Sequence, residues 1–158
     1  MARPVRNAPE QSATSSKRTF FATTKTASSR RILQSERNAS LLIDVLRSYA
    51  AAKKFEVHDF VVMPDHLHVL LTVRGEMTVE KAMQLIKGHF SYRLKREHGY
   101  LGEVWQVGFS ESRVDDPSSF DEHRAYIAQN PVKAGLALRA CEFPYCYEYL
   151  AEKKRRRG

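Results

Sequence analysis

The stretch Met63-Pro64-Asp65-His66-Leu67-His68-Val69-Leu70-Leu71 contains two histidines within an apolar run that is typical of a β-strand. Alternate side chains of a strand point to opposite faces of the sheet, so His66 and His68 share one face. The opposite face carries Leu67, Val69, Leu71 and Val73. Two imidazoles on a rigid strand could bind a metal ion, although such a pair is often only hydrogen-bonded polar residues. The metal hypothesis therefore requires further ligands elsewhere in the chain.

The hydrophobic pattern on both sides of this strand predicts the neighbouring elements. Upstream, aromatic and β-branched residues predict a strand over 19–24, helical spacing predicts a helix over about 35–53, and a second strand covers 55–63. Pro64 and Asp65 form a turn that joins this second strand to the histidine strand as a hairpin. Downstream, we expect a long helix over 77–98 with Thr78 as its N-cap, and then a strand over 104–114.

A third helix is predicted to begin after the pair Asp115 and Asp116. Aspartate is a favoured N-cap, and Pro117 suits the first helical position. We expect this helix to end near Gln129, because the next residue, Asn130, precedes a proline and is therefore disfavoured in the α region.

These elements follow the order β-α-β-β-α-β, with one more helix behind them. This order predicts an α+β fold of the ferredoxin-like split βαβ kind, with a four-stranded antiparallel sheet and two helices on one face. The apolar side of the histidine strand would face these helices, which leaves His66 and His68 on the open face. We expect the domain to span 18–147, between a disordered basic N-terminal tail over 1–17 and a basic C-terminal tail over 148–158.

The composition fits one intracellular domain with an anionic partner. The 158 residues include 26 Lys and Arg against 18 Asp and Glu, and this net charge of +8 favours a partner such as nucleic acid. Cys141 and Cys146 lack a second pair that would complete a four-cysteine zinc site, so two reduced thiols are expected. The sequence has no apolar run that could span a bilayer and no signal-peptide core, and we expect a soluble intracellular protein.

The third helix carries polar residues that complement the two histidines. Glu122, Tyr126 and Asn130 are spaced by four and form one stripe, and His123 lies beside Tyr126. A tyrosine on a helix usually serves packing. However, a metal held by two imidazoles needs further ligands, and Asn130 would supply an oxygen one turn from a phenol.

Four segments carry a family resemblance in the same order along the chain. They are Val62-Met63-Pro64-Asp65-His66-Leu67-His68, Leu85-Ile86-Lys87-Gly88, Val104-Trp105-Gln106-Val107-Gly108-Phe109 and Tyr126-Ile127-Ala128-Gln129-Asn130-Pro131-Val132-Lys133-Ala134-Gly135-Leu136. They resemble the single-tyrosine HUH transposases, and within them the tyrosine transposases associated with repetitive extragenic palindromes (REP). The resemblance extends from about Arg18 to Tyr147. It implies a ferredoxin-like catalytic domain in which His66 and His68 bind a divalent metal, Asn130 is a third ligand and Tyr126 attacks DNA.

The resemblance also implies a reaction and its partners. Mg²⁺ or Mn²⁺ would assist cleavage of single-stranded or hairpin DNA. A 5′-phosphotyrosine would form, and a second DNA end would then be joined. Glu122 and His123 are candidates for assisting the phenol of Tyr126. We expect this reaction at the nucleoid in a bacterial cytoplasm, with no membrane partner. Relatives include monomers and homodimers that exchange the tyrosine helix, so both states stay open. Candidate phosphate contacts are Arg30, Arg31, Lys87, Arg93, Lys95, Arg96, Lys153, Lys154, Arg155, Arg156 and Arg157, and candidates for stacking on bases are Tyr92 and Phe109.

Two other functions fit the same residues. A domesticated descendant could keep the fold and bind hairpin DNA without cutting it, although the joint presence of His66, His68, Tyr126 and Asn130 argues against such decay. A metal-dependent phosphoesterase could use water as its nucleophile, with Tyr126 only structural. A covalent adduct between the protein and DNA would distinguish the three functions.

Overall fold

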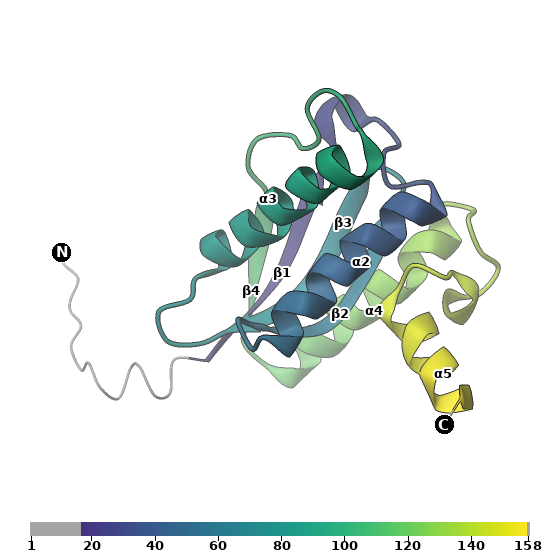
Figure 1. The fold of residues 1–158 in the computed structure, drawn as a ribbon. Coiled ribbons are helices and arrows are strands. Elements are labelled where there is room, and N and C mark those ends of the chain that lie inside the picture. The colour runs from purple at the N-terminus through teal and green to yellow at the C-terminus, as the bar shows by residue number, and fades with distance from the viewer. Residues whose placement is uncertain (1–16, 158) are drawn as a thin grey trace.

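The computed structural model of this chain describes residues 17–157, so the predicted N-terminal tail lies outside the description apart from Lys17. A four-stranded antiparallel sheet forms its centre, in the order β2-β3-β1-β4 (Figure 1). The strands are β1 (Arg18–Lys25), β2 (Glu56–Met63), β3 (His66–Val73) and β4 (Ser110–Val114). The histidine strand β3 lies between β2 and β1, and the predicted ferredoxin-like arrangement is confirmed.

Two helices cover one face of the sheet and build the main core. They are α2 (Glu36–Ala51) and α3 (Val79–His98), which lie side by side over the strands (Figure 1). Leu67, Val69 and Leu71 of β3 are fully buried in this core, as their alternation predicts. Thr78 caps α3 as predicted, because its side chain accepts a hydrogen bond from the backbone N–H of Lys81.

The opposite face of the sheet is not open, contrary to the prediction. The helix α4 (Pro117–Lys133) packs on β2 and β3 there, behind the sheet in Figure 1. Its residue Ile127 is buried in a second, smaller apolar cluster with Val61 and Leu70. Because α4 buries its apolar side, which includes Ile127, against the sheet, it covers the face that carries His66 and His68. His68 is therefore buried.

The predicted end of the third helix was wrong. Instead of stopping at Gln129, α4 continues through Pro131 to Lys133. Pro131 is buried, and the backbone carbonyls of Asn130 and Pro131 both accept hydrogen bonds from residues further along. Packing and these bonds outweigh the local preference against helix before a proline. As a result, Asn130 stays on the same helix as Tyr126.

The last predicted strand is shorter than expected. The prediction covered 104–114, whereas β4 begins only at Ser110. Residues 104–109 form a loop in which Trp105 makes an isolated bridge to Thr26. Gly108 interrupts the extended pattern because its φ of 83° is left-handed.

The segment predicted as a basic C-terminal tail is largely helical. The helix α5 (Tyr147–Arg157) follows a short 3-10 turn, η2 (Ala140–Glu142). Between them the chain crosses the outer edge of β2, where the Val62 N–H donates a hydrogen bond to the Tyr145 carbonyl and Val61 pairs with Cys146. This segment protects an edge that would otherwise be free to pair. Across residues 17–157, helices that combine the length and apolarity needed to cross a membrane are absent.

Candidate active site

His66 and His68 lie on the same face of β3, and their ring centroids are 4.7 Å apart. The Nδ1 atom of His66 donates a hydrogen bond to the Asp65 carboxylate at 2.7 Å. The Nδ1 atom of His68 is hydrogen bonded to the Thr23 hydroxyl, also at 2.7 Å. With both Nδ1 atoms held in this way, the Nε2 atoms are left to bind a ligand.

Burial keeps the His68 imidazole neutral. The side chain is only 6% exposed. Its burial and the charge of the neighbouring His66 lower the pKa of His68 to about 4, against the smaller opposing effect of the neighbouring Asn130 side chain. A neutral imidazole has the lone pair that metal coordination requires. The Asn130 side chain lies next to this histidine.

Tyr126 lies beside the imidazoles on α4. Its ring stands edge-on to that of His68, with centroids 5.4 Å apart. Phe21 of β1 contacts the rings of Tyr126, His68 and His123 at centroid distances of 5.8, 5.3 and 4.7 Å. Tyr126 is 46% exposed, so its phenol can be reached from solvent while one side of the ring is supported.

A β-bulge in β2 determines where α4 docks. The pairing of β2 with β3 shifts register between Val57 and Asp59. The two consecutive residues His58 and Asp59 then both contact α4. His58 packs against Phe120 at a ring-centroid distance of 5.3 Å, and Asp59 Oδ2 lies 3.3 Å from Arg124 Nε. Phe120 and Arg124 are one helical turn apart, so the bulge fixes two successive turns of the tyrosine helix.

The residues present at this site fit a divalent metal. The donors would be the Nε2 atoms of His66 and His68 and the amide oxygen of Asn130. A hydrogen bond between each Nδ1 atom and a neighbouring oxygen, here Asp65 and Thr23, is the outer-shell arrangement typical of metal-binding histidines. Within residues 17–157 no three His, Cys, Asp or Glu side chains gather into a metal cluster, so a third protein ligand would come from another type of group, such as the Asn130 amide.

The two candidates for assisting the phenol differ in their surroundings. His123 packs against Phe21 with the two rings tilted by 36°, and its Nδ1 atom donates to the Ser119 carbonyl at 2.8 Å. It shares the Phe21 contact with Tyr126 and belongs to the same cluster of side chains. Glu122 is exposed on α4 and has no hydrogen bond or ion pair with any residue the structure describes. A role for either residue stays a prediction.

Lys87 and Arg93, two of the predicted phosphate contacts, connect separate segments of the protein. The Lys87 ammonium donates to two carbonyls of the loop 104–109 at 3.1 and 2.6 Å. Arg93 pairs with Asp44 of α2 and with Glu97 of its own helix. Lys87 therefore holds the loop, and Arg93 joins α3 to α2. These structural roles are not visible in the pattern of charges.

The other predicted contacts lie at the surface, and DNA binding by them stays a prediction. Arg30 and Arg31 are exposed between β1 and α2, although the Arg30 guanidinium donates to the Glu103 carbonyl at 3.4 Å. Lys95 and Arg96 are exposed near the end of α3. In α5, Arg155 and Arg156 pair with Glu152 of the same helix, whereas Lys153, Lys154 and Arg157 are exposed and make no ion pairs in the described chain. Of the stacking candidates, Tyr92 is exposed and Phe109 is half-buried.

Several contacts of the site are not predictable from the pattern. Alternation puts Phe21 and Thr23 on one face of β1, but only the register that pairs Thr23 with His68 brings them to the site. No sequence pattern predicts the bulge that turns Asp59 toward α4. The contact of Asp65 with His66 could have been predicted from the sequence, because a carboxylate that directly precedes a histidine can accept a hydrogen bond from it.

Sequence comparison places the chain among known proteins. The family described as "Transposase IS200 like" matches residues 15–130. A REP-associated tyrosine transposase of Escherichia coli (strain K12) is 28% identical over 94 residues, which are 59% of this chain and 54% of that protein. The match thus spans about half the length of this relative. A Haemophilus influenzae protein assigned by name to the same group is 25% identical over 131 residues, covering 72% of this chain and 74% of that protein.

Structural comparison agrees on the fold. A solved structure described as a REP-associated tyrosine transposase bound to a REP hairpin superposes with a TM-score of 0.68. It is 24% identical and covers 82% of this chain and 75% of that chain. The family match begins at residue 15, before β1, and extends to Asn130, so it includes the whole sheet, α2, α3 and Tyr126. This chain belongs to the IS200-like transposase family.

Proposed function

We propose that this chain cleaves and rejoins single-stranded DNA through Tyr126, at hairpin-forming sequences of the REP kind. The observation that carries the proposal is the accessible phenol of Tyr126 lying 5.4 Å, ring to ring, from His68, with the Asn130 side chain beside the same imidazole. Membership of the transposase family and the names of the relatives support DNA processing. The neighbour bound to a REP hairpin supports hairpin DNA as the partner.

In the proposed reaction, Tyr126 attacks the scissile phosphorus in line. The bond between its Oη atom and phosphorus forms while the bond from phosphorus to the 3′ oxygen breaks, and the phenol proton passes to the released 3′ end. The 5′-phosphotyrosine retains the energy of the phosphodiester, so a second 3′-hydroxyl can reverse the step and join two strands. Mg²⁺ or Mn²⁺ held by His66, His68 and Asn130 would polarise the phosphate and stabilise charge on the leaving oxygen.

Tyr126 would act within its own chain, on DNA in the bacterial cytoplasm. Tyr126 lies against His68 of its own chain, so attack in cis would not require α4 from a second copy. Action on chromosomal hairpins would place the protein at the nucleoid of a bacterial cytoplasm.

The decisive test is formation of a covalent adduct. With labelled single-stranded hairpin DNA and Mn²⁺, the wild-type chain should give a protein–DNA band that survives a denaturing gel. Tyr126→Phe should lose the band completely, and Tyr100→Phe should keep it. Free cleaved DNA from both wild type and Tyr126→Phe would mean that water is the nucleophile. Hairpin binding with no cleavage by the wild type would favour a non-cleaving DNA-binding protein.

The metal assignment has its own test. His66→Ala and His68→Ala should abolish cleavage while hairpin binding is retained, because the imidazoles act on the scissile phosphate. Asn130→Ala should also reduce cleavage strongly, whereas Gln129→Ala removes an exposed neighbouring amide and should leave cleavage unchanged. Undiminished cleavage by both histidine variants, or in the presence of a chelator, would exclude the proposed metal role.

A further inference from the structure

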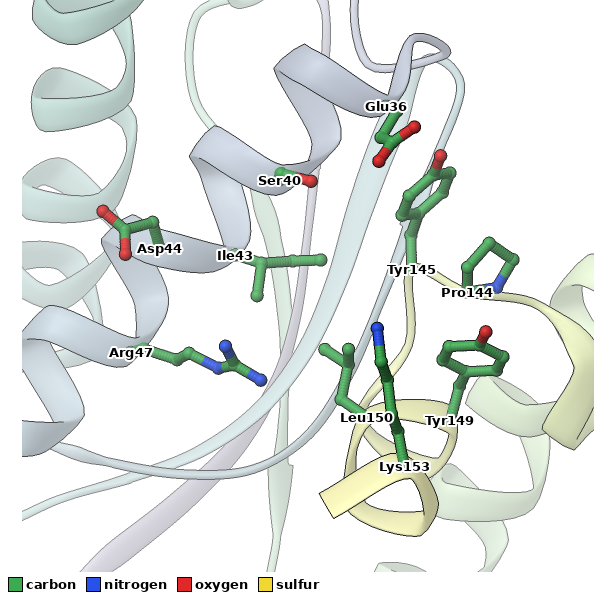
Figure 2. A pocket seen from close by; sticks show the side chains of 10 residues that line it. All are labelled: Glu36, Ser40, Ile43, Asp44, Arg47, Pro144, Tyr145, Tyr149, Leu150 and Lys153. Atoms are coloured by element: carbon green, nitrogen blue, oxygen red, sulfur yellow. The ribbon is translucent and has the colours of Figure 1, made fainter. Parts of the chain in front are cut away.

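A cavity separate from the tyrosine site lies between α2 and the C-terminal segment. Its volume is about 350 Å³. In Figure 2, Arg47 of α2 and Lys153 of α5 both extend into the space between the two helices, and Tyr145 and Tyr149 line the C-terminal side. Because α2 covers the face of the sheet opposite to α4, this cavity does not share its walls with the site around Tyr126.

The cavity is rich in hydrogen-bond donors that the protein itself does not use. Between residues 17 and 157, no carboxylate or carbonyl pairs with the guanidinium of Arg47 or the ammonium of Lys153. The hydroxyl groups of Tyr145 and Tyr149 also lack hydrogen bonds to that part of the chain. A cavity walled by free donors from two elements can bind an anion without first breaking an internal contact.

The positive charge continues beyond this cavity. A neighbouring cavity shares Arg47 and Leu150 with the first and is also lined by Lys154. A third shares Ala50 and Val57 with the second and adds two further lysines. We call the surface along these three cavities the basic trough. Apart from Arg74, which is paired with Glu56, its cations are Arg47, Lys53, Lys54, Lys153 and Lys154.

The carboxylates of the basic trough do not cancel this charge. Asp44 is paired with Arg93, and Glu56 is paired with Arg74. Glu36 is a third lining carboxylate, at the end of the first cavity near Tyr145 (Figure 2). Apart from Arg74, the cations of the trough make no ion pair within the described chain. The net charge of the trough is therefore positive.

We propose that the basic trough binds a stretch of single-stranded DNA that flanks the segment cleaved at Tyr126. The identity of the polymer rests on the proposed function. A row of cations along adjoining cavities suits a polyanion better than a single phosphate. The tyrosine rings beside the cations suit unpaired bases, which stack on aromatic side chains. The trough would hold the flanking strand on the protein between cleavage and joining.

The test is equilibrium binding in a Tyr126→Phe background, in which the proposed adduct cannot form. The probe is a fluorescent DNA hairpin with or without a single-stranded flank, titrated at several salt concentrations. Each phosphate contact on a single strand contributes roughly 0.7 to the slope of log K against log salt. The double variant Arg47→Gln, Lys153→Gln should therefore make the negative slope for the flanked hairpin shallower by about 1.4. This corresponds to roughly a 25-fold loss of affinity at 0.1 M salt relative to 1 M. Lys81→Gln, at an exposed position of α3 outside the trough, should leave the slope unchanged.

An unchanged slope in the double variant would overturn the proposal. An equal loss for the hairpin without a flank would overturn the assignment to single-stranded DNA and indicate a duplex in the trough. Thermal unfolding checks that the variants are folded, and both substituted side chains are exposed. Since binding is measured without chemistry, failure of the wild type to form an adduct would overturn the cleavage proposal and not this one.

Discussion

The two faces of the sheet hold their helices by different means. On one face, α2 and α3 pack through fully buried apolar side chains such as Leu42 and Phe90. On the other face, a small apolar cluster is supplemented by contacts of His58, Asp59 and His68 with α4. Burial of apolar surface makes the first face the main source of stability. Burial of polar groups on the second face costs stability but arranges groups that can do chemistry.

Truncation on the apolar face should give the largest loss of stability. Phe90 of α3 is fully buried, and its ring packs against that of Trp105. Phe90→Ala should lower the free energy of unfolding by about 3 to 5 kcal/mol, because it leaves a cavity in a close-packed core. Urea denaturation followed by circular dichroism measures this loss. Tyr92→Ala, two residues away and exposed, is the control and should change stability by less than about 0.5 kcal/mol. Similar losses in both variants would contradict the assigned role of this face.

The apolar face could be predicted from the sequence because its signals are local. The alternation of Leu67, Val69 and Leu71 and the N-caps Thr78 and Asp116 depend only on neighbouring residues. The candidate site could be predicted in part, since His66, His68, Tyr126 and Asn130 stand in recognisable segments. The structure brings these four side chains together, while their chemical roles stay proposals.

The rest of the α4 face depends on contacts between distant segments. The register of β1 against β3 places Phe21 and Thr23 at the site, and the bulge in β2 turns Asp59 toward Arg124. The continuation of α4 through Pro131 depends on the burial of that proline. None of these features produces a periodic pattern in the sequence. Local patterns therefore predicted the wrong end for α4 and an exposed face where α4 in fact covers the sheet.

The α4 face should also lose stability as the pH falls. Burial, with the nearby charge of His66, lowers the pKa of His68 to about 4, whereas the ordinary value is 6.5. Between these values the unfolded chain binds more protons than the folded chain. The stabilising contribution is therefore complete above about pH 6.5 and is lost as the pH falls toward 4. A shift of this size corresponds to on the order of 3 kcal/mol.

This pH dependence can be separated from that of other groups by one substitution. The free energy of unfolding is measured at pH 7 and pH 4.5, in a buffer with a chelator, for the wild type and for His68→Gln. The variant should lose less stability over this range, because glutamine does not titrate. Parallel losses in the two proteins would show that His68 is not the group responsible.

The ion pair between Asp59 and Arg124 should respond unequally to removal of its two partners. Asp59 is 4% exposed, and burial raises its pKa although the hydrogen bond from Arg124 acts against this. The Arg124 side chain is 43% exposed and keeps much of its hydration. Arg124→Gln leaves a buried carboxylate without its cation and should cost about 1 to 2 kcal/mol. Asp59→Asn should cost less, because the amide retains an oxygen that accepts from the Phe60 N–H.

A double-mutant cycle by urea denaturation tests whether this contact is direct, since the double variant should then cost less than the sum of the single variants. The contact also bears on the proposed chemistry, because Arg124 lies two residues before Tyr126 on the helix that the bulge fixes. Measured well below the melting temperature, Arg124→Gln should slow adduct formation even though the protein stays folded. Adduct formation at the wild-type rate would mean that the apolar contacts of Ile127 position the tyrosine helix by themselves, and the polar contacts of this face would then serve only its stability.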